Sequence, residues 1–435
     1  MKREMIDLHK SSYKYIIFLI TFALTLWINI RAIPTTSMEY DESHWIHTST
    51  YYEVLLTQPA NSSYWDEIYW TLTQPPMARY VIGFSRSLFG IDSTQLNKPW
   101  DFDLTYEENV ANNNMPSKQL LYISRLPMAI LSSFTATMIF ILLFEGAGLI
   151  ASVAFLFLYG MNGLLIADLV RAMGDPPFIF FITLSAFICF FAIREYQLAL
   201  ENHGHRKYTK SYILFFLSAF MCGLGGSSKI NGLLACSGIL LVVFIQTVFF
   251  TKHLTDQIKF SLIVRFSFLI IMASLFAFIV VNPYLYPNPF ERIGRMYKFR
   301  FGEMAIQIQR YPESHVSGFT KRVNLLFKEI LPSFYPIRNL FFSILNLVLI
   351  ILGCRSIFDA YIMGQNNHSQ KFGPYVFVLI FLPLALAAFL TPLNWERYLL
   401  PCVFFNLVSI SVAINWLVSM LINNGQKTAQ KRAQE

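Results

Sequence analysis

Residues Tyr15–Ile33 read YIIFLITFALTLWINIRAI, an apolar run in which Arg31 is the only charged residue. As a helix, these residues would extend about 28 Å, close to the roughly 30 Å of a bilayer core. The preceding residues include Lys2, Arg3, Lys10 and Lys14, and basic flanks are typical of the cytoplasmic side. Because residues 31–34 make a poor cleavage site, we predict an uncleaved first membrane helix with its N-terminus in the cytoplasm.

The composition extends this interpretation to the whole chain of 435 residues. It is 55% hydrophobic and only 14% charged, whereas soluble domains contain about 25% charged residues. We therefore predict an all-α polytopic membrane protein with about ten transmembrane helices, eleven being the alternative count. Residues 1–435 are expected to form one transmembrane domain with both termini cytoplasmic.

The remaining apolar segments define the other spans. Residues 212–250 would extend about 58 Å as one helix, so they are divided into two spans that break at 223–229. The other predicted spans are Ser124–Phe144, Leu149–Ala167, Pro177–Ile193, Leu262–Val281, Leu340–Cys354, Tyr375–Thr391 and Leu399–Ile422. Residues 355–373 are expected to form a polar cytoplasmic loop.

Two long polar segments, 34–121 and 282–338, are predicted on the outer side. In the first, we expect a helix at Asp41–Leu56, with Trp45, Tyr52 and Leu56 near one face. A second helix is expected at Met77–Phe89, followed by a loop at 90–118. In the second segment, a basic run at 292–310 is interpreted as a solvated or headgroup-binding face.

The net charge of +8 does not indicate nucleic-acid binding, because the basic residues lie in short loops and tails, as membrane topology requires. The five cysteines lie within or at the ends of apolar segments and form no CxxC pair. This pattern argues against a disulfide framework and against a zinc site.

The stretch that follows the first span, Thr36–Tyr52, is unusual for an apolar chain. It reads TSMEYDESHWIHTSTYY and contains three carboxylates and two imidazoles. Its carboxylates could simply begin an interfacial helix, where negative charge is favoured. Alternatively, His44 and His47 could bind a divalent metal ion with the carboxylates, although we assign no metal or other cofactor.

The predicted topology places the unusual polar residues on one side of the membrane. Charged side chains within the bilayer are costly. Several separate spans place such residues at the same face of the membrane, where they can converge, and this predicts a functional site at that face. A carboxylate there could deprotonate a nucleophile, and cations could bind the phosphate of a lipid carrier. As alternatives, Arg171/Asp175 and Glu396/Arg397 could be structural ion pairs, and Lys229 could mark a span edge. The residues concerned are Asp41, Glu42, Asp168, Arg171, Asp175, Lys229, the 292–310 run, Glu396 and Arg397.

Six motifs resemble, in order, those of the GT-C superfamily of membrane glycosyltransferases. The resemblance is nearest to the protein O-mannosyltransferase family and its bacterial polyprenyl-phosphate-sugar relatives. The motifs are Tyr40-Asp41-Glu42, Gln74-Pro75-Pro76-Met77-Ala78, Ser124-Arg125-Leu126-Pro127, Arg171-Ala172-Met173-Gly174-Asp175, Gly226-Ser227-Ser228-Lys229-Ile230-Asn231-Gly232 and Arg397-Tyr398-Leu399-Leu400-Pro401.

The resemblance implies inverting transfer of a hexose, mannose among the candidates, from a polyprenyl- or dolichyl-phosphate to an acceptor hydroxyl on a protein, lipid or glycan. It implies that Asp41 is the general base, with Glu42 supporting it or binding the acceptor. It also implies that Arg171, Lys229 and Arg397 bind the carrier phosphate, with Asp175, His44 and Gln74 as supporting or acceptor-binding residues. We expect the site on the outer face of a bacterial inner membrane.

Two other functions remain open from the sequence. A transporter or lipid flippase would also be polytopic, although such proteins often place ionisable groups near mid-membrane and contain inverted repeats. A non-catalytic partner subunit of a related enzyme is the third option.

Overall fold

The computed structural model describes residues 2–201, 208–249, 254–332, 339–366 and 372–434. Within these ranges the chain is a bundle of helices, and its only β-type pairing is an isolated bridge between His315 and Leu393. Nine of the described helices are long and apolar enough to cross a membrane, and a bent pair would make a tenth. The predicted all-α polytopic membrane fold is confirmed.

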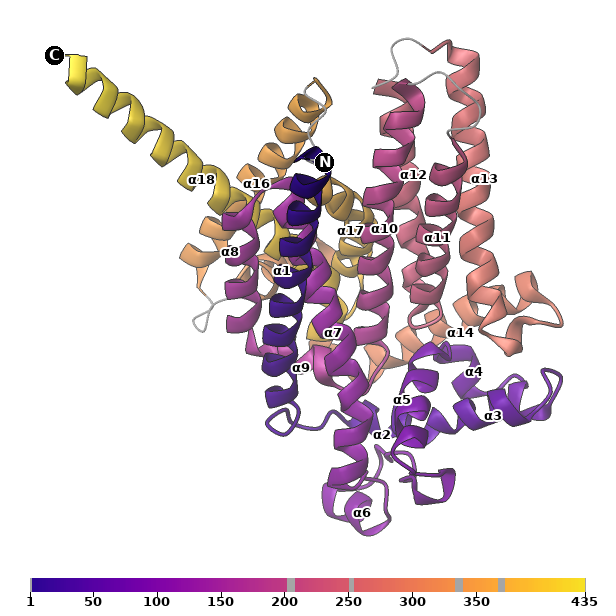
Figure 1. Cartoon of the computed structure of the whole chain (residues 1–435). Helices are drawn as coiled ribbons and strands as arrows, with labels where there is room; N and C mark the ends of the chain where they lie inside the picture. The colour runs from indigo at the N-terminus through magenta and orange to yellow at the C-terminus, as the bar shows by residue number, and fades with distance from the viewer. Residues whose placement is uncertain (1, 202–207, 250–253, 333–338, 367–371, 435) are drawn as a thin grey trace.

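The long helices form the body of the bundle (Figure 1). Their lengths follow from the apolar runs in the sequence. The predicted division of residues 212–250 into two helices is confirmed, but the break lies at residues 227–234, because the first of these helices continues through Gly226. The long helices are α1 (Lys2–Ala32), α7 (Lys118–Gly146), α10 (Asp175–Glu201), α11 (Tyr208–Gly226), α12 (Ala235–Phe249), α13 (Asp256–Val280), α16 (Leu340–Asn366), α17 (Gly373–Leu390) and α18 (Leu400–Gln434).

The span predicted at Leu149–Ala167 is not one continuous helix. The structure has two helices there, α8 (Leu149–Met161) and α9 (Gly163–Val170), which are bent by 77°. Asn162 causes the break: its backbone leaves the helical conformation, and its side chain accepts a hydrogen bond from the Leu165 amide, which caps α9.

Other predicted boundaries also differ. The polar loop expected at 355–373 is largely helical because α16 continues to Asn366, and residues 367–371 lie outside the described part of the chain. The loop expected at 90–118 contains a short helix, α6 (Tyr106–Ala111).

The helix expected at Asp41–Leu56 is divided by a 3-10 turn into α2 (Tyr40–His47) and α3 (Tyr51–Thr57). Trp45 is buried and Leu56 is 66% exposed, so the predicted shared face is wrong. The helix expected at Met77–Phe89 is confirmed as α5 (Met77–Leu88).

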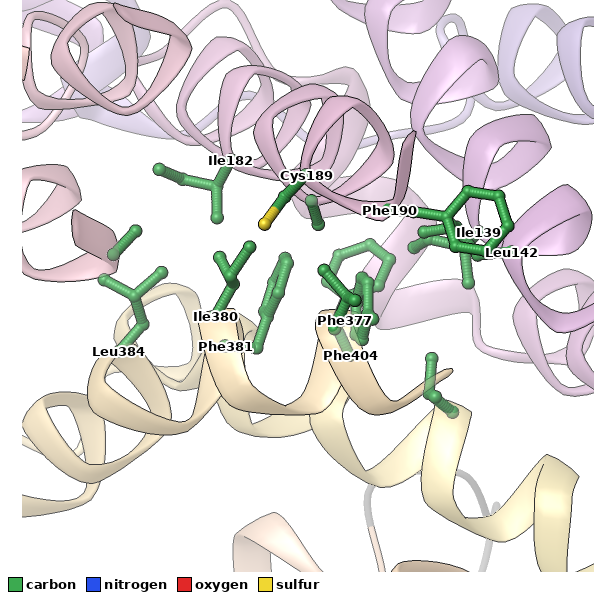
Figure 2. Close-up of a cluster of buried hydrophobic side chains, with 14 of the residues drawn as sticks. Ile139, Leu142, Ile182, Cys189, Phe190, Phe377, Ile380, Phe381, Leu384 and Phe404 are labelled. Atoms are coloured by element: carbon green, nitrogen blue, oxygen red, sulfur yellow. The ribbon is translucent and has the colours of Figure 1, made fainter. Parts of the chain in front are cut away.

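The core lies where α7, α10, α17 and α18 meet. Figure 2 shows Ile182 and Cys189 of α10 facing Ile380 and Phe381 of α17, and all four side chains are fully buried. Elsewhere in the bundle, small residues let neighbouring helices approach one another closely, as is usual for helices that pack in membranes.

The two long polar segments cover one end of this bundle, which we call the loop end (Figure 1). There, α14 (Pro289–Arg310) packs against α4 (Tyr69–Thr73), while α5 packs against α7. The N-terminal end of α1 and the C-terminal end of α18 lie toward the opposite end. The fold therefore brings distant polar segments together over the ends of several long helices.

We expect Gly353→Ala to destabilise the bundle. A Cβ at this position in α16 would lie 1.9 Å from the Ser409 carbonyl oxygen of α18. Overpacking of this kind costs about 1–3 kcal/mol. Thermal unfolding in detergent should show a lower Tm. Gly302→Ala, on α14 with no neighbouring atom within 4 Å, is the control and should not lower the Tm. An unchanged Tm for Gly353→Ala would contradict this packing.

Candidate active site

A cavity of about 400 Å³ opens at the loop end of the bundle. Among the described residues that line it, five are charged: Asp41, Asp175, Lys229, Arg300 and Arg397. They come from α2, α10, the turn after α11, α14 and the 3-10 helix η9 (Glu396–Leu399). His44 and Gln74 also line the cavity, so the structure brings six of the eight predicted site residues together.

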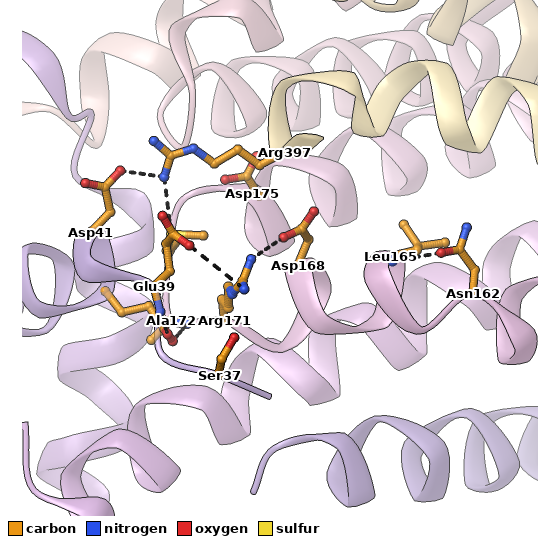
Figure 3. Close-up of polar contacts among 12 residues, drawn as sticks. Ser37, Glu39, Asp41, Asn162, Leu165, Asp168, Arg171, Ala172, Asp175 and Arg397 are labelled. Atoms are coloured by element: carbon orange, nitrogen blue, oxygen red, sulfur yellow. Dashed lines mark hydrogen bonds and ion pairs between the residues drawn. The ribbon is translucent and has the colours of Figure 1, made fainter. Parts of the chain in front are cut away.

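Asp41 lies in the first turn of α2, with its carboxylate beside the guanidinium of Arg397 (Figure 3). Asp41 Oδ2 is 2.5 Å from Arg397 Nη1, and the Asp41 side chain is 33% exposed. The same guanidinium lies over the rings of Trp395 and Tyr398, at 5.4 and 5.5 Å. The carboxylate is therefore accessible from the cavity but is paired with a cation.

Electrostatics keep Asp41 ionised. Burial raises the pKa of this carboxyl, but Arg397, with smaller contributions from His44 and Arg300, outweighs burial and lowers the pKa below its usual value. Burial also lowers the pKa of His44, despite the opposing charge of Asp41. His44 Nε2 lies 2.9 Å from the Trp100 carbonyl oxygen, which can only accept, so the proton of the neutral ring is on Nε2. Asp41 is thus a proton acceptor at neutral pH.

Lys229 forms an ion pair with Asp175 and lies 5.1 Å from the centre of the Tyr398 ring. The turn that contains Lys229 lies close to the Arg171–Asp175 loop. A Cβ at Gly174 would lie 2.9 Å from the Ser228 carbonyl oxygen, so only glycine permits this approach without displacement. On the other side, the Met77 amide donates to the Ser227 carbonyl at 2.9 Å. Four of the quoted motifs therefore meet at the turn that contains Lys229.

Arg300 is a cavity residue that the sequence analysis missed. It lies on α14, and its Nη2 donates to the Tyr398 hydroxyl at 2.7 Å. Met304 and Gln307, one and two turns further along α14, also line the cavity. Residues 300, 304 and 307 share one face of a helix, and this spacing could have distinguished the side of α14 that faces the cavity from the rest of the basic run.

The 292–310 run is exposed at Arg295, Lys298 and Arg310, as a solvated face requires, but its arginines also contact protein. Arg295 pairs with Glu67 and Glu291, and Arg310 pairs with Asp103 at 2.9 Å. Arg292 donates to the Tyr284 carbonyl. These contacts attach α14 to the first polar segment and fix the cavity wall.

Glu42 was predicted to be catalytic, but the structure gives it a positioning role. It is fully buried and does not line the cavity. Arg125 binds both of its carboxylate oxygens, at 2.8 and 2.5 Å, and the Ala172 and Glu39 amides donate to them at 2.8 and 3.0 Å. With four donors already bound, the carboxylate has little capacity left for a substrate.

Arg171 was predicted to bind the carrier phosphate, but it does not line the cavity. It lies between Asp168, at 2.6 Å, and Glu39, at 3.9 Å (Figure 3). Its charge is therefore engaged by two carboxylates, but the predicted alternative of an ion pair with Asp175 is wrong, because Asp175 pairs with Lys229.

The residues suggested as metal ligands do not converge. His44 contacts the Trp100 carbonyl, and His47 Nδ1 lies 2.9 Å from the Asn97 carbonyl oxygen. Within the described ranges, no group of three or more His, Cys, Asp or Glu side chains is arranged to bind a metal ion. The metal alternative at His44 and His47 therefore does not fit the geometry.

The cavity also has an apolar wall. Leu384, Ala387 and Ala388 of α17 line one side, and Phe301 and Met304 of α14 line another. An apolar surface beside a cluster of cations suits a ligand with an anionic head and an apolar tail.

The fold and this cavity define a membrane protein of the GT-C type. The archaeal oligosaccharyltransferase AglB from Archaeoglobus fulgidus, in complex with an inhibitory peptide and a dolichol-phosphate, aligns with a TM-score of 0.52 at 12% identity, over 96% of this chain and 52% of that one. Its apo form aligns with a TM-score of 0.51 at 12% identity, over 95% and 52%. The S. cerevisiae Pmt1-Pmt2 protein O-mannosyltransferase complex bound to the sugar donor gives a TM-score of 0.41 at 13% identity, over 75% and 37%.

The chain belongs to the dolichyl-phosphate-mannose-protein mannosyltransferase family, whose model matches residues 44–292, more than half of the sequence. No protein of curated function matches it. The chain spans about half the length of the AglB structures it resembles. Asp41, Arg300 and Arg397 lie outside the matched residues, so it is the structure that brings them to the cavity.

We expect Glu42→Ala and Asp41→Asn to have different effects on folding. Glu42→Ala leaves Arg125 buried without its counterion, which typically costs about 3–5 kcal/mol. Asp41→Asn alters a partly exposed pair and should change stability by less than about 1 kcal/mol. Thermal unfolding and gel filtration in detergent would compare them. Equal stability of the two variants would contradict the separate roles assigned to these adjacent carboxylates.

Proposed function

We propose that this protein transfers a sugar from a polyprenyl- or dolichyl-phosphate carrier to an acceptor hydroxyl, with inversion at the anomeric carbon. The observation that carries the proposal is a carboxylate, Asp41, that lines the same cavity as three cations, with an apolar wall beside them. The family match supports a phosphate-linked hexose donor such as mannose. The presence of a dolichol-phosphate in one AglB structure supports the same class of carrier.

In this proposal, the carrier phosphate binds among Lys229, Arg300 and Arg397, which approach the cavity from three separate elements. Charge-assisted hydrogen bonds from these groups strengthen as negative charge develops on the departing phosphate. The start of the lipid chain follows the apolar wall formed by α17 and α14. Asp175 keeps Lys229 in place through their ion pair.

Asp41 acts as the general base. Its carboxylate accepts the proton of the acceptor hydroxyl while the hydroxyl oxygen bonds to the anomeric carbon. The bond from that carbon to the phosphate oxygen breaks, and its electron pair leaves with the polyprenyl phosphate. Attack from the side opposite the phosphate inverts the anomeric configuration.

Donor binding also activates this base. Arg397 is paired with Asp41 in the structure, and this contact lowers the basicity of the carboxylate. A carrier phosphate competes for the same guanidinium. Drawing Arg397 toward the phosphate raises the pKa of Asp41, so the donor binds before the acceptor is deprotonated.

The acceptor is a hydroxyl on a protein, lipid or glycan, and the site faces the outer side of a bacterial inner membrane. The distribution of basic residues supports this orientation. Lys2, Arg3 and Lys10 begin the chain at the end of the bundle opposite the cavity, where cytoplasmic lysine and arginine are expected. Both termini are then cytoplasmic.

A transfer assay tests the function. Purified protein is incubated with a labelled polyprenyl-phosphate-hexose, and membranes from a strain lacking the gene supply the acceptor. We expect a covalently labelled product, and a rate about 10²–10⁴-fold lower for Asp41→Asn. Full activity of Asp41→Asn would contradict the assignment of the base. Movement of the donor across vesicles without a covalent product would instead indicate a flippase.

Arg300 gives a separate test of the phosphate site. We expect Arg300→Met to weaken binding of polyprenyl phosphate by about 10–100-fold, because a hydrogen bond to a charged group contributes about 1.5–3 kcal/mol. Lys298→Met is the matched control, since it removes a positive charge from the exposed side of the same helix. Equal losses in the two variants would show a general charge effect and contradict a direct contact.

A further inference from the structure

Arg79 is a buried guanidinium with an unusual environment. It lies on α5, is 1% exposed, and forms no ion pair with a carboxylate in the described part of the chain. Its Nη2 donates to the Trp70 carbonyl at 2.7 Å and to Gln74 Oε1 at 3.1 Å, while its Nε has no partner there. The rings of Tyr51 and Trp45 lie 4.8 and 5.9 Å from the guanidinium carbon.

The other two fully buried arginines pair with carboxylates. Arg86 binds Glu53, and Arg125 binds Glu42. Burying a guanidinium without an anionic partner is costly, and the aromatic rings offset only part of that cost. Arg79 is the exception among the three, and its side-chain partner is a residue that lines the cavity.

The chemistry of this contact determines how the Gln74 amide is oriented. Burial lowers the pKa of Arg79 only to about 10, so the guanidinium remains protonated at neutral pH. A guanidinium has donors and no acceptor, so Gln74 must turn its oxygen toward Arg79. Its NH₂ group must then point away from Arg79. Gln74 Nε2 has no hydrogen-bond partner among the described residues. It is also not one of the fully buried polar atoms that lack a partner.

We propose that Arg79 is a positioning residue, which fixes the Gln74 carboxamide so that its N–H donates to a phosphate or sugar oxygen of the substrate. The inference rests on the proposed function. The hydrogen bond from the Met77 amide to the Ser227 carbonyl holds the Gln74 segment against the turn that carries Lys229. The oxygen bound by Gln74 therefore lies on the same substrate as the groups bound by the cavity cations.

Gln74→Glu distinguishes the role of the side-chain oxygen, which binds Arg79, from the role of the NH₂ group. A carboxylate of the same shape would give Arg79 the anionic partner that it lacks, and it would replace the donor toward the cavity with an acceptor. We expect an equal or higher Tm together with at least tenfold weaker binding of polyprenyl phosphate or the sugar-linked donor. Gln307→Glu, which adds the same charge at another lining residue, is the control and should weaken binding less.

The Arg79 variants test the positioning role. Arg79→Met should raise the KM for the donor more than it lowers kcat, because the Gln74 amide is no longer held. Arg79→Lys, which keeps a protonated donor, should partly restore the KM. Equal effects of the two variants on Tm, without a change in KM, would mean that the role is only structural and would overturn the proposal.

Two ligands identify the oxygen that Gln74 binds. Weaker binding of both polyprenyl phosphate and its hexose conjugate to Gln74→Glu would indicate a phosphate oxygen. Weaker binding of the hexose conjugate alone would indicate a sugar oxygen. Unchanged binding of both ligands, or a clearly lower Tm of this variant, would overturn the inference. Wild-type protein that binds neither ligand would instead overturn the proposed function.

Discussion

The buried ion pair between Glu42 and Arg125 organises the loop end of the protein. Arg125 also donates to the carbonyls of Ile33, Thr36 and Ser37, which connects the end of α1 to the start of α2. Glu42 in turn accepts from the Ala172 amide, next to the loop that carries Asp175. Because successive helical residues point about 100° apart, burying Glu42 leaves its neighbour Asp41 directed toward the cavity. One carboxylate holds the structure, and the adjacent one is available for chemistry.

The charged residues of the cavity include one more cation than carboxylates. Asp41 is paired with Arg397 and Asp175 with Lys229, so each carboxylate has its own cation. Arg300 contacts only a neutral hydroxyl among its described partners. A carrier phosphate adds negative charge, for which Arg300 and Arg397 are the suitably placed cations. In the proposed function, the same arrangement would provide both the phosphate site and the activation of the base.

The sequence predicted the features that depend on local composition. Long apolar runs located the spans, and the excess length of residues 212–250 predicted that α11 and α12 are separate helices. The bend at Asn162 was missed because one asparagine does not interrupt the hydropathy of a span. The sequence identified the charged residues of the site but not which of them face the cavity, because that depends on partners distant in the chain. Arg171 is engaged by Asp168 and by Glu39 from the first polar segment, whereas Arg300 reaches Tyr398, 98 positions away in the chain.

The central claim is that a carrier phosphate draws Arg397 away from Asp41. A high-resolution structure of the protein in lipid nanodiscs with bound polyprenyl phosphate tests it most directly. The account predicts a phosphate within hydrogen-bonding distance of Lys229, Arg300 and Arg397, with the Arg397–Asp41 contact broken. A phosphate bound elsewhere, while Arg397 remains on Asp41, would contradict it.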